Sequence, residues 1–75
     1  MNKQRRKEIE MICERLEDLY SDLESVMDEE QSAFDNLPES LQYTEKGEQM
    51  EENVSTIENS LDSIREAIDN LEDLL

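Results

Sequence analysis

The chain has 75 residues, of which 22 are acidic and seven are basic, and its net charge at pH 7 is −15. Its single cysteine and its lack of histidine exclude an internal disulfide and a zinc site built from the usual ligands. A chain this short buries only a small core, so we expect oligomerisation or a protein partner to supplement its stability.

The charge also limits what the chain can bind directly. An acidic surface repels nucleic acid and anionic membranes, so we expect the acidic body to bind neither. No apolar run approaches the roughly 20 residues of a membrane span, and no signal-peptide core follows the charged N-terminus. The unpaired cysteine suits a reducing compartment, and together these features favour a cytoplasmic protein.

The basic residues gather at the N-terminal end, in residues 1–7. Lys3, Arg5, Arg6 and Lys7 supply four of the seven positive charges, whereas all 22 acidic residues follow them. In an antiparallel hairpin this end would lie beside the acidic C-terminal end and partly neutralise it. The alternative is a tail that binds nucleic acid or a partner protein.

Residues 8–34 carry apolar residues spaced three and four apart, which is the repeat of a coiled-coil helix. The a and d positions of this heptad repeat hold Ile9, Ile12, Leu16, Leu19, Leu23 and Val26. We expect this line to face a second helix.

A second apolar line runs beside the first, at heptad position e. Its members are Cys13, Tyr20, Met27 and Phe34. A stripe this wide is typical of four-helix bundles. We therefore expect these residues, with Leu74 on the second helix, near a dimer contact. The alternatives are that they only edge the hairpin core, or that they anchor a different protein in helix-in-groove fashion.

The opposite side of the first helix is predicted to be an acidic face. Its residues are Glu10, Glu14, Glu17, Asp18, Glu24 and Asp28. Such a run of carboxylates is most often a solvated surface, and its functional alternative is imitation of nucleic acid.

Residues 35–43 combine helix-ending signals with apolar residues. Pro38 disfavours helix at Leu37 and suits the first turn of a new helix, so we expect a short helical turn at 38–42. Thr44 resembles a helix start, which Gly47 weakens slightly. A role for this connection in recognition is the alternative reading.

Residues 44–75 repeat the coiled-coil pattern. Its apolar a and d positions are Met50, Val54, Ile57, Leu61, Ile64, Ile68, Leu71 and Leu75. Pairing residues whose numbers sum to 80 sets apolar against apolar from Ile9 with Leu71 to Val26 with Val54. The sequence therefore predicts one all-α domain, residues 1–75, folded as an antiparallel two-helix coiled-coil hairpin that dimerises into a four-helix bundle.

The chain lacks the residues of an enzyme site. There is no histidine to activate Cys13, and the sole glycine, Gly47, cannot form a glycine-rich phosphate loop. The acidic runs lack the spacing of an EF-hand loop. We expect no enzymatic activity, no metal and no cofactor.

Two classes of function remain. The first is a helical protein–protein interaction module, a homodimer that also binds another protein. The second is an acidic nucleic-acid mimic that inhibits a DNA-binding or RNA-binding defence protein of the anti-CRISPR or anti-restriction type. B-DNA carries about 26 charges over ~45 Å, the expected length of each arm. A dimer of this chain would carry twice −15.

The segment from Asn36 to Gln42, followed by Glu45 to Glu52 and a second acidic heptad helix, resembles small acidic helical proteins of bacteriophages and prophages of Gram-positive gut bacteria. The likeness covers nearly the whole chain, including the basic start from Lys3 to Lys7. It identifies no functional residue. It implies a phage accessory protein in the cytoplasm of a bacterial host, where inhibition of a host defence system is the expected kind of activity.

Overall fold

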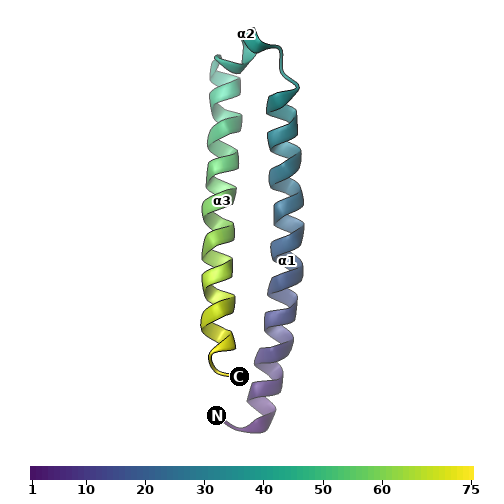
Figure 1. The fold of residues 1–75 in the computed structure, drawn as a ribbon, viewed down its shortest axis with the longest axis vertical. Coiled ribbons are helices and arrows are strands. Elements are labelled where there is room, and N and C mark those ends of the chain that lie inside the picture. The colour runs from purple at the N-terminus through teal and green to yellow at the C-terminus, as the bar shows by residue number, and fades with distance from the viewer.

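The computed structural model describes all 75 residues as an all-helical hairpin (Figure 1). Helix α1 spans Lys3–Asp35, the four-residue helix α2 spans Glu39–Gln42, and helix α3 spans Glu45–Glu72. The long helices α1 and α3 lie side by side and antiparallel, with both termini at the end opposite α2 (Figure 1). The rod measures 58 × 15 × 12 Å. The predicted all-α hairpin is confirmed.

Helix α1 begins at Lys3, five residues before its expected start at residue 8. Asn2 caps this end, because its side-chain Oδ1 accepts a 2.8 Å hydrogen bond from the backbone N–H of Arg5. Basic side chains in a first turn oppose the helix dipole, so the cap offsets an unfavourable local charge pattern. The basic N-terminal end is therefore the first turns of a helix rather than a separate tail.

The connection is tied to the end of α1 by one side chain. Gln42 donates hydrogen bonds from its amide nitrogen to the carbonyl oxygens of Phe34, at 3.3 Å, and Leu37, at 3.2 Å. The Phe34 carbonyl also accepts from the backbone N–H of Leu37, so Gln42 adds a second bond at the end of α1 and one bond within the connection itself. Pro38 directly precedes α2, so the expected helical turn after the proline is present.

Gly47 is buried in the first turn of α3 for a steric reason. A Cβ atom there would lie 2.6 Å from the carbonyl carbon of Gln42 and 2.8 Å from its Cα, and it would overlap the carbonyl oxygen. The end of α2 approaches α3 so closely that only glycine fits. From the sequence, Gly47 was expected only to weaken the start of the helix.

Helix α3 presents the predicted line to α1. Leu61 and Ile68, both at position a, are the buried hydrophobic residues of this helix, and the d positions Met50, Ile57 and Ile64 are half-buried. The heptad interpretation is therefore confirmed from Met50 to Leu71, but the predicted extension of the helix to residue 75 was wrong, because α3 ends at Glu72 and Leu75 is exposed.

Helix α1 presents a different line from the one predicted. Position d was expected to face α3, yet Ile12, Leu19 and Val26 are 45%, 57% and 50% exposed. Cys13, at position e, is buried with 5% exposure, and the other e residues are half-buried. The prediction that d rather than e completes the α1 side of the hairpin seam was wrong at Ile12 and Leu19, whereas Val26 lies half exposed at the edge of the seam, where it lines a hollow together with Ile57 of α3.

The difference corresponds to a rotation of α1 about its own axis. At 100° per residue, a seam centred between a and e lies about 50° from one centred between a and d. The register moves with it: hydrogen-bonded residues across the seam sum to 82 for Glu17 with Arg65 and to 83 for Asn53 with Glu30. Tyrosine, methionine and phenylalanine at e offer more apolar surface than isoleucine, leucine and valine at d, which favours the rotated seam.

Gly47→Ala should destabilise the hairpin, although alanine is the better helix former by about 1 kcal/mol. The added methyl meets backbone that must shift, so we expect a loss of about 1–3 kcal/mol in the free energy of unfolding. Urea denaturation followed by circular dichroism measures it. Ser55→Ala, at an exposed position of α3, is the matched control and should change stability by less than about 0.5 kcal/mol. An unchanged or raised stability of Gly47→Ala would contradict this account.

Candidate functional site

The rotation of α1 leaves an apolar line open to solvent. We call this line, Met11, Ile12, Leu19 and Val26, the α1 stripe. Its members are 49%, 45%, 57% and 50% exposed. Three of them recur every seven residues, which keeps them on one side of the helix. Exposed apolar residues that share one side of a helix are a candidate contact surface, whereas single exposed apolar residues are ordinary.

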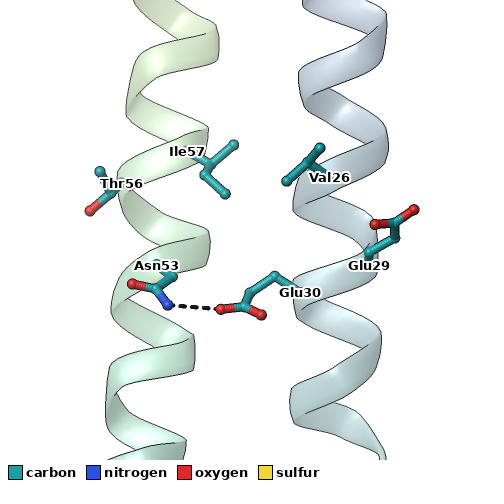
Figure 2. Close-up of a pocket in the computed structure, with 6 residues that line it drawn as sticks. All are labelled: Val26, Glu29, Glu30, Asn53, Thr56 and Ile57. Atoms are coloured by element: carbon teal, nitrogen blue, oxygen red, sulfur yellow. Dashed lines mark hydrogen bonds between the residues drawn. The ribbon is translucent and has the colours of Figure 1, made fainter.

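The α1 stripe borders a hollow between the two long helices near the connection. This hollow, of about 470 Å³, is lined by Val26, Glu29, Glu30, Asn53, Thr56 and Ile57. Figure 2 shows Val26 and Ile57 pointing toward each other across the gap between the helices. The floor is therefore apolar where the stripe meets α3.

The same hollow contains a polar layer of the seam. The side-chain amide of Asn53 donates a 2.8 Å hydrogen bond to a carboxylate oxygen of Glu30 (Figure 2). Glu30 occupies position a of the heptad repeat. The other a positions of α1 hold aliphatic residues, such as Ile9 and Leu16. A carboxylate needs more room and water than an aliphatic side chain, so the helices leave an opening here.

A second, smaller hollow lies at the other end of the stripe. It measures about 260 Å³ and is lined by Glu8, Met11, Ile12 and Arg15. The two hollows thus flank Leu19, the most exposed member of the stripe.

One ion pair joins the two long helices. Arg65 donates hydrogen bonds from both terminal nitrogens to the two carboxylate oxygens of Glu17, at 2.8 and 3.0 Å. Its guanidinium carbon also lies 4.7 Å from the centroid of the Tyr20 ring, within cation–π range. The Arg65 hydrogen bond lowers the pKa of Glu17, and the same bond raises the pKa of Arg65.

This cluster was not predicted from the sequence. The available signal was that Arg65 is the only basic residue in the C-terminal half of α3 and directly follows Ile64, a seam residue. In an antiparallel hairpin, an arginine next to a seam residue can reach the acidic side chains of the facing helix.

Cys13 lies in the seam as a small apolar residue. Burial raises the pKa of its thiol, and the carboxylates of Glu72 and Glu17 raise it further. The protonated thiol packs well but is a poor nucleophile.

The expected interface residues occupy two different environments. Cys13 is buried in the hairpin seam, and Tyr20, Met27 and Phe34 are half-buried beside it. Leu74 is 46% exposed and lies two residues beyond the end of α3 at Glu72.

The expected acidic face is largely open to solvent. Its exposed members are Glu10, Glu14, Asp18, Glu24 and Asp28. Glu17 is the exception, because it is half-buried and bound to Arg65. No other ion pair occurs in the structure, so the basic residues at the start of α1 form none with the acidic C-terminal end.

No three cysteine, aspartate or glutamate side chains converge as a metal-binding group. Neither long helix has the length and apolar character together that a bilayer span requires.

No protein-family model matches the chain, and neither the curated proteins nor the solved structures contain a significant match to it.

Glu17→Gln tests the Arg65 cluster through its pH dependence. The lowered pKa of Glu17 means that its pairing stabilises the fold above its ordinary pKa of 4.5 and that this contribution is lost as the pH falls through the lowered value. At pH 7 we expect the variant to melt about 1–5 °C below the natural chain, since the pair is partly exposed. The difference should shrink as the pH falls below 4.5.

Thermal melts by circular dichroism at several pH values give this comparison. Glu24→Gln is the control, because it also removes one negative charge but from an exposed, unpaired carboxylate. A Tm difference for Glu17→Gln that is independent of pH, or equal to that of Glu24→Gln, would count against the cluster.

Proposed function

We propose that the protein is a non-enzymatic interaction module whose hairpins associate in pairs into a four-helix bundle that binds another protein. The observation that carries this proposal is the lack of a core. Only Cys13, Leu61 and Ile68 are buried hydrophobic residues in the single hairpin. Two helices share one contact line, so the rest of each helix faces solvent.

The exposed area supports pairing. A compact monomer of 8.8 kDa exposes about 4,800 Å², whereas this chain exposes 5701 Å². The excess of roughly 900 Å² is close to the ~800 Å² that each partner buries in a standard protein interface. A second hairpin would therefore bring the exposed surface to the level of an ordinary small protein.

The binding partner of the bundle is a host or phage protein in this proposal. The support is the resemblance of the segments from Asn36 to Gln42 and from Glu45 to Glu52 to phage proteins, and with it we propose that the chain acts in the cytoplasm of a bacterial host. The acidic face on α1 stays outside such a bundle and is the surface offered to that partner.

A second candidate function, imitation of nucleic acid, is favoured by the free carboxylates. Of the 22 acidic residues only Glu17 forms an ion pair. The hairpin is 58 Å long, and B-DNA of that length carries about 34 charges. A pair of hairpins carries twice −15, which is a similar charge density.

Pairing predicts the mass in solution. Light scattering on a size-exclusion column should give twice the 8.8 kDa of one chain, and Tm should rise with protein concentration, because folding is then coupled to association. A mass of 8.8 kDa with a Tm independent of concentration would refute the four-helix bundle.

The two functions differ in how they respond to charge reversal. The triple variant Glu10→Lys, Glu14→Lys, Glu24→Lys changes exposed carboxylates and leaves the Glu17 pair intact. If the protein imitates nucleic acid, it should inhibit DNA cleavage by restriction or CRISPR nucleases, less so at high salt, and the variant should not. For an interaction module of the first kind, we expect cleavage to proceed unchanged with either protein. Salt-sensitive inhibition lost in the variant would favour imitation.

A further inference from the structure

We infer that the α1 stripe is covered by the α1 stripe of a second copy of this chain, laid antiparallel with the two Leu19 side chains meeting at the two-fold axis. This inference rests on the proposed pairing of hairpins and adds the surface, the orientation and the register.

The spacing of the stripe is symmetric about Leu19. Ile12 and Val26 lie seven residues before and after it, which is about 10 Å in each direction along the helix. A two-fold axis perpendicular to α1 at Leu19 therefore sets Ile12 of each chain against Val26 of the other. The same patch then serves on both chains, as an isologous interface requires.

The same axis sets the smaller hollow of each chain opposite the larger hollow of the other chain. The smaller one lies beside Met11 and Arg15, and the larger one lies beside Val26 and Ile57. An antiparallel partner brings its exposed Met11 to the mouth of the larger hollow, whose floor at Val26 and Ile57 is apolar. A flexible methionine suits an opening of irregular shape.

The charge along α1 favours the antiparallel orientation. Residues 3–18 contain five basic and five acidic residues, whereas residues 19–35 contain six acidic residues and no basic one. An antiparallel pair sets the neutral half of each helix against the acidic half of the other. A parallel pair would set the two acidic halves together, which repel.

Individual charges beside the stripe lead to the same orientation. Arg15 precedes Leu19 by four residues and Asp22 follows it by three, so each Arg15 lies near Asp22 of the second copy. Glu8 and Glu29 oppose each other farther out, where solvent screens their repulsion. In a parallel pair all these contacts would join like charges.

The register is tested by disulfide trapping in a chain whose Cys13 is replaced by alanine. Leu19→Cys should cross-link to itself under mild oxidation. Ile12→Cys and Val26→Cys, mixed, should form the mixed dimer and little of either self-linked dimer, since cysteines must approach closely to bond. A size tag on one chain separates these products by gel electrophoresis. Ser21→Cys, about 200° around the helix from Leu19, is the control and should stay unlinked.

The outcomes separate this inference from the proposed function. A self-linked Ile12→Cys dimer would mean a parallel pair, and an unlinked Leu19→Cys chain of dimeric mass would mean another surface. Either result overturns the inference while the bundle stands. A monomeric mass overturns both.

A second variant in the natural chain avoids the loss of Cys13. Leu19→Glu would bury two carboxylates at the axis, so we expect the dimer dissociation constant to rise roughly 100-fold. Circular dichroism monitors folding, and Ser21→Glu is the matched control that should remain dimeric. A Leu19→Glu chain as dimeric as the control would overturn the inference.

Discussion

The structure depends on one constraint: two helices can share only a single line of contact. Each helix therefore leaves most of its circumference in solvent, and the hairpin buries very few side chains. The remaining contacts of the fold hold the helices in position. Gln42 ties the connection to α1, Gly47 lets α2 approach α3, and Arg65 joins the long helices at their exposed edge. None of these contacts enlarges the apolar core, so the apolar area still exposed on α1 is the main source of further stability.

The orientation of α1 shows where reasoning from the sequence stops. Helix positions, the antiparallel hairpin, the seam of α3 and the turn after Pro38 all follow from local spacing and turn chemistry. Local spacing does not decide the rotation of α1, because positions d and e are both apolar and lie on either side of position a. Contacts between residues far apart in sequence decide it. Arg65 of α3 binds Glu17 and covers the Tyr20 ring, so these contacts favour the orientation that turns position e toward α3.

The same ambiguity affected the candidate site. The sequence predicted a stripe on α1 too wide for one partner, and the structure divides that stripe between the seam and the solvent. The division is the reverse of the expectation: Cys13 is buried, and Leu19, expected in the seam, is 57% exposed. The composition of a heptad repeat reveals how much apolar surface a helix has, whereas the neighbouring helix determines which part remains open.

The two lines of α1 also differ in chemistry. The seam contains a thiol, a tyrosine beside an ion pair, and a carboxylate hydrogen-bonded to Asn53. Such polar members limit sliding of the helices but add little stability, since each loses its hydration on packing. The open stripe is aliphatic apart from Met11. The side of α1 that faces α3 thus fixes how the two helices of the hairpin align, and in the proposed bundle the open, aliphatic side would stabilise the pair of hairpins. In the proposed bundle, folding would then be coupled to association. The acidic outer surface would be ordered mainly when two hairpins are paired.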